Sequence, residues 1–217
     1  MKAFFTRFFD LFIGNVLFAF GIVGMIKANI GYAPWEVFHV GIANTIGLGL
    51  GVTSIIVGSF IVIIVTALGE KFGFGTIACM VMTGAFVDII LFADFVPKLE
   101  NLVGGIVLLI AGLFTISVGS YFYLRSAFGS GPRDSLMVVL ARKTKMPVGA
   151  CRSIVELTAT LIGWRLGGMI GIGTVVSVVM IGFCIQITFW ALKFDVKAVK
   201  HETFADTYRS ISVKRPE

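Results

Sequence analysis

The sequence predicts an all-α membrane protein with about six transmembrane helices, arranged as two inverted three-helix repeats that each contain a short re-entrant or broken helix. Two observations predict this class. Hydrophobic residues make up 57% of the chain and charged residues 14%, whereas about a quarter of the residues in soluble domains are charged. The chain also repeats its unusual residues after about 98 positions, a sign of internal structural duplication. We therefore expect a first membrane repeat over residues 1–97, a second over 98–194 and a cytoplasmic tail over 195–217.

Glycines, prolines and charged residues carry the repeat. These residues fix the path of the backbone, so their coincidence indicates duplication better than matches between aliphatic residues. The longest match places Gly31-Tyr32-Ala33-Pro34-Trp35-Glu36 over Gly129-Ser130-Gly131-Pro132-Arg133-Asp134. Further pairs are Gly14 with Gly112, Gly21 with Gly119, Lys27 with Arg125, Gly51 with Gly149 and Gly84 with Gly182. Two matched sets predict faces where helices pack closely, Gly69-x-x-x-Gly73-x-Gly75 and Gly167-x-x-x-Gly171-x-Gly173.

Six apolar stretches are long enough, or nearly so, to cross a bilayer, which takes about 20 residues of helix. The fifth is the least regular because Arg152, Glu156 and Arg165 interrupt it. Each Gly-x-x-Pro segment, between the first and second stretches and between the fourth and fifth, leads into about a dozen helix-compatible residues, too few to cross. The six stretches cover about residues 8–26, 52–68, 74–92, 102–123, 150–166 and 172–192.

The distribution of Lys and Arg predicts that both termini are cytoplasmic. With the N-terminus inside, most basic residues fall on the cytoplasmic side and the outer side keeps chiefly Lys27, Lys98 and Arg165, in line with the basic excess of cytoplasmic loops. A unit of three spans must enter the membrane from the opposite side in its second copy, so the repeat is inverted. Folds of this kind place a binding site near the middle of the bilayer.

The remaining compositional features exclude several classes of protein. We assign the net charge of +6 to cytoplasmic loops and expect no nucleic-acid partner. The first apolar stretch continues to Ile26 without a small-residue cleavage site, which favours a retained span over a signal peptide. Cys79, Cys151 and Cys184 show neither disulfide nor zinc spacing, so we expect no metal and no cofactor.

Two interpretations of the Gly-x-x-Pro segments remain open. In the structural one, Pro34 and Pro132 begin ordinary helices, and the acids that follow, Glu36 and Asp134, favour the helix dipole. In the functional one the segments are re-entrant, because the core after Asp134 is apolar all round and ends in a basic cluster, unlike a surface helix. Two helix amino ends would then approach the midplane from opposite faces and form a central site.

The functional interpretation leaves the charge of the ligand open. Helix amino ends favour an anion, and Arg133, Lys27 or Arg125 would add positive charge. Glu36 and Asp134 would instead neutralise these cations, or bind a cation or proton. The sequence therefore predicts the place of a site and not the sign of its ligand.

Polar residues within the spans add Asn15 and Asp88 as candidates, because such groups are costly in a membrane. For Asp88, a position close to the outer end of its span is the alternative explanation. His39 fits a hydrogen-bonded core residue better than a proton relay, and Arg152 with Glu156 fits an intrahelical pair. The predicted binding residues are Gly31, Pro34, Glu36, Gly129, Gly131, Pro132, Arg133, Asp134, Asp88 and Asn15.

The two Gly-x-x-Pro segments and Gly171-Ile172-Gly173-Thr174 resemble the YczE/YyaS/YitT family of bacterial integral membrane proteins, and its YczE-like branch most. The resemblance spans nearly the whole chain. It implies a multi-pass protein of the bacterial plasma membrane, and it supplies no substrate.

Three functions compete at this point. The first is a small transporter or channel for a small polar or ionic solute, favoured by the inverted repeat and the paired helix starts. The alternative is a non-transporting accessory protein that supports a partner membrane complex. An enzyme is not expected, because the sequence lacks spaced metal ligands or a nucleophile with its base. The expected partners are the lipid bilayer and an unknown small solute, and self-association into a homo-oligomer stays open.

The topology can be tested with reporter fusions at residue 97 and at the C-terminus. We expect the two reporters to lie on opposite sides of the membrane, because three spans separate the outer loop from the cytoplasmic tail. Reporters on the same side would remove the inverted repeat.

Overall fold

A computed structural model describes residues 2–69, 72–129, 131–146, 148–194 and 199, without the side chains of residues 2–4, 134, 138, 148, 149 and 152. The predicted tail, 195–217, lies outside the described residues apart from residue 199. All regular secondary structure in the described part is α-helical, as predicted. The helices are α1 (Lys2–Lys27), α2 (Pro34–Ile46), α3 (Leu50–Ala67), α4 (Phe74–Ala93), α5 (Leu102–Arg125), α6 (Pro132–Thr144), α7 (Val148–Arg165) and α8 (Ile172–Ala191).

Five helices of the described part, α1, α3, α4, α5 and α8, are long and apolar enough to cross a membrane. The sequence predicted a sixth span where α7 lies. That helix has 18 residues, which matches the length of α3, but it contains Arg152, Glu156 and Arg165. The chain thus carries several membrane-spanning helices, and the sixth span stays a prediction.

Helices α2 and α6 are the short helices expected after the Gly-x-x-Pro segments. Each begins with a proline at its amino end, where the missing N–H costs no hydrogen bond. Helix α2 ends at Gly47, whose φ of 70° closes the last turn. Both have 13 residues, a length of about 20 Å that is shorter than the hydrocarbon core.

Helix bounds follow the repeat through the whole chain. Helix α6 starts and ends about 98 residues after α2, and the same shift relates α3 to α7 and α4 to α8. The last residue of α1, Lys27, corresponds in the same way to the last residue of α5, Arg125. The duplicated pattern of glycines and prolines therefore corresponds to a duplicated order of four helices.

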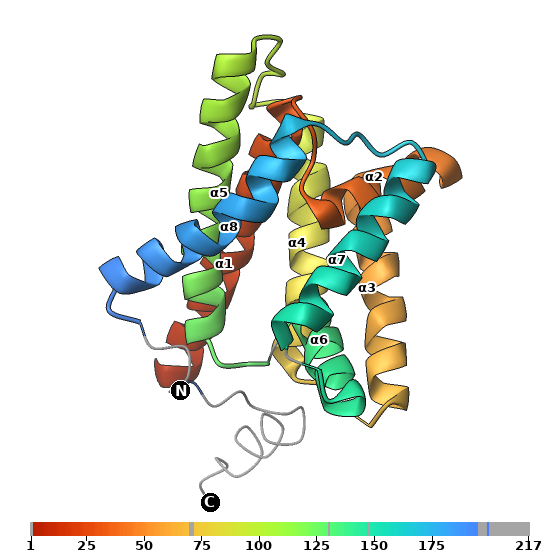
Figure 1. The fold of residues 1–217 in the computed structure, drawn as a ribbon. Coiled ribbons are helices and arrows are strands. Elements are labelled where there is room, and N and C mark those ends of the chain that lie inside the picture. Colours follow the sequence, from red (N-terminus) through yellow and green to blue (C-terminus); the bar gives the residue numbers. More distant parts are fainter. Residues whose placement is uncertain (1, 70–71, 130, 147, 195–198, 200–217) are drawn as a thin grey trace, which may run out of the picture.

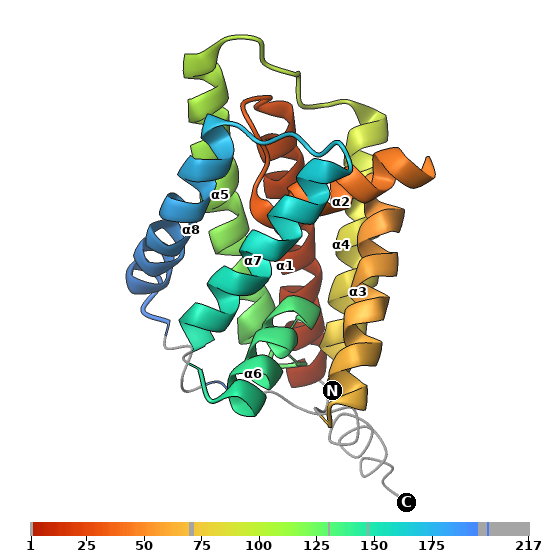
Figure 2. The same cartoon turned by 45° about the vertical axis from the view of Figure 1, so that its right-hand side comes forward.

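The helices form two layers (Figures 1 and 2). In the first layer α1 and α5 pack together, with α4 beside α1 and α8 beside α5. In the second layer α2 packs on α7, and α3 packs on α6. Each layer has its own apolar core: Val23, Leu109 and Cys184 belong to the first, and Trp35, Ile61 and Val139 to the second.

Glycines allow α1 and α5 to pack closely. A Cβ atom added at Gly14 would lie 2.9 Å from the carbonyl oxygen of Gly119, and one at Gly21 would lie 2.7 Å from that of Gly112. Because Gly112 and Gly119 are the repeat partners of Gly14 and Gly21, the two contacts are equivalent. The sequence marked these glycines as repeat positions without predicting that they meet.

Three glycines of the predicted packing sets, Gly75, Gly171 and Gly173, are closely packed as expected, and two are not. A Cβ atom at Gly75 would lie 2.7 Å from the Cβ of Phe128, so this position needs glycine. The prediction is wrong for Gly69 and Gly167, which have open space around them. Their φ angles of +89° and +93° show the reason, since both reverse the chain after a helix.

The glycine contact between α1 and α5 can be tested by Gly21→Ala, with Gly182→Ala as the matched control. Alanine favours a helix by about 1 kcal/mol over glycine, and Gly182 has no atom within 4 Å of an added Cβ. We expect Gly182→Ala to keep or raise the unfolding temperature in detergent. Gly21→Ala should lower it, because the added methyl group meets the backbone of α5. Equal effects would contradict the packing.

Candidate functional site

A cavity of about 630 Å³ lies between the two layers, and all eight described helices contribute to its wall. Both Pro34 and Pro132 line it, so one space joins the two helix starts that the sequence paired. Most of the wall is apolar. Its polar members among the described residues are Glu36, His39, Ser54, Thr83, Ser120, Tyr123, Arg133, Glu156 and Ser177, with the thiol of Cys79.

The two loops that lead into α2 and α6 bring these helix starts to the cavity. Gly31 and Gly129 have φ angles of +114° and +136°, a conformation that glycine adopts readily. Each glycine also lies close to the other half of the chain. A Cβ atom added at Gly31 would lie 2.6 Å from the backbone nitrogen of Gly171, and one added at Gly129 would lie 3.0 Å from Cα of Gly73. Gly31 and Gly129 do not line the cavity, but they fix the loops that place the starts of α2 and α6 at its wall.

Hydrogen bonds between the halves hold both loops in place. The N–H of Gly173 donates to the carbonyl of Ile30 at 2.7 Å, and the N–H of Gly75 donates to that of Phe128 at 2.8 Å. Phe128 and Gly173 are the repeat partners of Ile30 and Gly75. Each loop therefore completes its backbone hydrogen bonding with the other half of the chain.

Arg133 is the centre of the polar part of the wall. Its Nη1 lies 3.6 Å from Oε1 of Glu36, and its Nη2 lies 3.4 Å from Nδ1 of His39. The guanidinium also stacks on the ring of Trp35, with 4.8 Å from Cζ to the ring centroid. Glu36 and His39 are 5% and 4% exposed, whereas the Arg133 side chain is 30% exposed, so the group is buried on the α2 side and partly open at Arg133.

This group joins the two repeats. Trp35, Glu36 and His39 belong to α2, whereas Arg133 belongs to α6 and is the repeat partner of Trp35. Since Arg133 can only donate, Nδ1 of His39 accepts its hydrogen bond. His39 is thus the hydrogen-bonded core residue that the sequence favoured.

Helix α7 adds a second carboxylate. Glu156 lines the cavity and acts electrostatically on Glu36. The sequence paired Glu156 with Arg152, whose side chain lies outside the described residues. Neither Glu156 nor Trp35 was predicted as a wall residue. The sequence did contain a signal for Glu156, because it is the acidic residue of an otherwise largely apolar stretch.

The structure separates the ten predicted binding residues into three groups. Pro34, Glu36, Gly131, Pro132 and Arg133 line the cavity. Gly31 and Gly129 lie behind the wall, as described above. Asn15 and Asp88 lie elsewhere, and the side chain of Asp134 is outside the described residues.

Asn15 and Asp88 have structural partners. Asn15 donates to the carbonyl of Leu11 at 2.6 Å and accepts from the hydroxyl of Thr83 at 2.7 Å, which links α1 to α4. Asp88 accepts the N–H groups of Gly51 and Val52 at 2.7 and 3.0 Å. The carboxylate thereby satisfies two donors at the amino end of α3, which a helix leaves unpaired.

Lys27 and Arg125, considered as sources of positive charge for the site, lie at opposite ends of the molecule (Figure 1). Lys27 pairs with Asp94. Arg125 donates to both carboxylate oxygens of Asp10, at 2.9 and 2.7 Å. Both cations are engaged away from the cavity, so Arg133 is the basic residue that the described part contributes to its wall.

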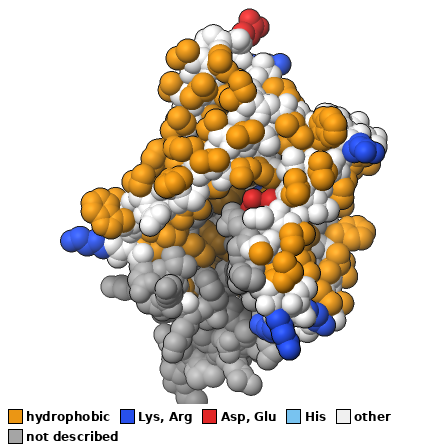
Figure 3. Space-filling model, viewed as in Figure 1, with side chains coloured by type: hydrophobic (Ala, Val, Ile, Leu, Met, Phe, Trp, Pro, Cys, Tyr) orange, Lys and Arg blue, Asp and Glu red, His pale blue; other side chains and the backbone are white. Residues whose placement is uncertain are grey.

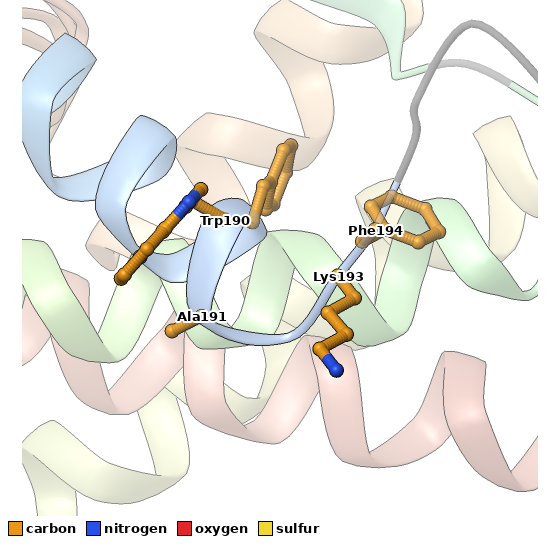
Figure 4. Close-up of a pocket in the computed structure, with 5 residues that line it drawn as sticks. Trp190, Ala191, Lys193 and Phe194 are labelled. Atoms are coloured by element: carbon orange, nitrogen blue, oxygen red, sulfur yellow. The ribbon is translucent and has the colours of Figure 1, made fainter.

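A second, shallow hollow lies at the end of α8 (Figure 4). It is lined by Phe189, Trp190, Ala191, Lys193 and Phe194. The Trp190 side chain is 81% exposed. An exposed tryptophan beside a lysine is typical of a helix end at the membrane surface, so we assign this hollow to anchoring and not to solute binding.

The family of the chain follows from comparison with known proteins. The model of a family of unknown function, DUF6198, matches residues 5–189. The chain belongs to this family. Because the match covers both repeats, the cavity lies within the family region.

Curated relatives confirm the resemblance found in the sequence. The uncharacterized membrane protein YczE of Bacillus subtilis (strain 168) is 33% identical over 178 residues, which cover 81% of each chain. An uncharacterized protein of Haemophilus influenzae is 28% identical over 179 residues, 80% of this chain and 81% of the relative. The uncharacterized protein YyaS of Bacillus subtilis is 26% identical over 178 residues, 81% of this chain and 88% of the relative. No solved structure matches the chain.

The link between the repeats through Glu36 and Arg133 can be tested with a double-mutant cycle. We expect Glu36→Gln and Arg133→Gln each to lower the stability in detergent, because each leaves its partner buried without a counter-charge. The double variant should lose less than the sum, with a coupling of about 0.5–3 kcal/mol. Thermal unfolding monitored by circular dichroism would measure this. Additive effects would show that the pair is not coupled.

Proposed function

We propose that the protein is a small membrane transporter that binds its solute in the cavity between Pro34 and Pro132. The observation that carries this proposal is the meeting of the two helix starts at Pro34 and Pro132, one from each repeat, at a single cavity. Discontinuous helices at a repeat interface are the usual solute site of secondary transporters.

The proposal includes an inverted topology of the two repeats. It is supported by the opposite directions of α1 and α5 (Figure 1), by the matching helix bounds, and by the equivalent glycine contacts between α1 and α5. The cytoplasmic placement of both termini belongs to the same proposal. It is supported by Arg142, Lys143 and Lys145, which lie at the carboxyl end of α6, at the end of the molecule where α1 begins.

Charge and geometry give the cavity its proposed chemistry. Glu36 accepts and Arg133 donates, so a bound solute would meet both signs of charge within one polar group. Their separation of 3.6 Å exceeds the 2.7–2.9 Å of a close charge-assisted hydrogen bond. A solute could therefore form hydrogen bonds with Glu36 and Arg133 without first breaking a close ion pair between them.

The layers suggest how access would alternate. The loops before α2 and α6 connect the first layer to the second, and each contains a glycine with a positive φ angle. Rocking of the α2, α3, α6 and α7 layer against the other would change which side of the cavity is open. That the protein is not an enzyme stays a prediction.

Flux measurements separate transport from the accessory role. Liposomes that contain only the purified protein would be loaded with a ¹³C-labelled small-molecule extract of bacterial cytosol, and escaping compounds would be identified by mass spectrometry. We expect at least one compound to leave faster than from liposomes with the Glu36→Gln/Arg133→Gln variant, checked for correct folding. No difference for any compound, combined with loss of a partner complex when the gene is deleted, would favour the accessory role.

A further inference from the structure

The two edges of the cavity differ although the repeat makes them equivalent. At one edge α3 packs on α4, and a Cβ atom at Gly84 would lie 2.7 Å from the carbonyl of Gly51. At the other edge α7 and α8 make almost no contact in the described part of the chain. Gly182, the repeat partner of Gly84, has no atom within 4 Å of an added Cβ. Among the described residues, helix packing closes one edge and leaves the other open.

The sequence supplies a reason for this difference. The sealed edge depends on Gly58, whose added Cβ would lie 2.6 Å from Sδ of Met80. At the repeat positions of these two residues, the open edge has Glu156 and Val178. A charged side chain on α7 replaces the glycine that lets α4 approach α3, so α8 stays apart from α7.

Exposed apolar side chains lie on both helices of the open edge. Leu157 on α7 is 61% exposed, and Val178 and Phe183 on α8 are 51% and 56% exposed. Figure 3 shows a hollow between these two helices, with hydrophobic side chains along its upper border and acidic side chains at its edge. Helix α8 is apolar enough to cross a membrane, where exposed side chains of this kind face lipid. On the α8 side, the gap therefore opens toward the hydrocarbon of the bilayer.

The wall inside the gap suits an apolar chain. Val178, Ile181, Ile185 and Phe189 line the cavity from one face of α8. The volume of about 630 Å³ lies within the range of pockets for drug-sized ligands. The charged side chains of the described wall, Glu36, Arg133 and Glu156, include both signs.

We propose that the cavity binds an amphipathic molecule with a single apolar chain and a zwitterionic head, which enters from the bilayer between α7 and α8. A head with both charges can pair with Glu36 and Arg133 together, whereas a head of one sign can pair with only one of them. The apolar wall favours such a ligand over the small polar or ionic solute suggested by the sequence. This inference rests on the proposed function for its biological meaning, and binding can be measured apart from transport.

Fluorescence of Trp35 provides the test, because Trp35 lines the cavity and is 7% exposed. The protein would carry Trp164→Phe and Trp190→Phe, and would be placed in nanodiscs of unbrominated lipid. A single-chain phosphocholine with a brominated tail is the probe. We expect saturable quenching of Trp35, and binding that is roughly tenfold weaker for a brominated single-chain maltoside, whose uncharged head lacks two charge-assisted contacts.

Two variants test the route. Gly182→Phe places a ring in the open space between α7 and α8, whereas Val107→Phe adds the same ring to a lipid-facing position of α5 that is 63% exposed. We expect Gly182→Phe to slow quenching by about tenfold at unchanged unfolding temperature, and Val107→Phe to leave it unchanged. If Gly182→Phe lowers the unfolding temperature, Gly182→Leu replaces it with the same expectation.

Three results would overturn the inference. The first is the absence of Trp35 quenching at probe concentrations that quench the fluorescence of the parent protein with all three tryptophans. The second is equal quenching by a brominated two-chain bilayer lipid, which would show that Trp35 merely faces lipid. The third is the same response in both ring variants. Since no flux enters this measurement, a failure of transport would leave a positive binding result intact.

Discussion

The need to satisfy every backbone polar group in a membrane governs this structure. Helices do so within themselves, but a chain that breaks its helices inside a bilayer needs partners from elsewhere. Here each loop before a short helix takes a partner from the other half of the chain: the carbonyl of Ile30 accepts from Gly173, and that of Phe128 accepts from Gly75. The two halves are therefore mutually dependent, and the helix starts at Pro34 and Pro132 face the same cavity because the loops before them are bound across the molecule.

The charged pair Glu36 and Arg133 in the cavity wall lowers the stability of the fold. Removing Glu36 and Arg133 from water is unfavourable, and at 3.6 Å their attraction recovers only part of that cost. The stacking of Arg133 on Trp35 and its contact with His39 add compensation. A wall that needed only stability would be apolar throughout, so these residues support the proposed binding role of the cavity.

Sequence patterns predicted much of the fold and part of the site. Repeat register and proline positions predicted the starts of α2 and α6, because these depend on local backbone rules. Which surfaces meet depends on side chains far apart in the chain, and hydropathy does not encode it. Asp88 therefore looked like a candidate for function, although it satisfies the amino end of α3. The sequence did not reveal the difference between the α3–α4 edge and the α7–α8 edge for the same reason. That difference depends on which residues of two separate helices face each other.

The capping of α3 by Asp88 has a mechanical consequence. Two hydrogen bonds and the contact between Gly51 and Gly84 tie α3, a helix of the second layer, to α4, a helix of the first. A rotation of one layer against the other would turn about this edge, because the attachment there resists separation. Displacements would grow with distance from that axis and become largest where α7 and α8 diverge. The carboxylate at position 88, remote from the cavity, would thus set the direction in which the cavity widens.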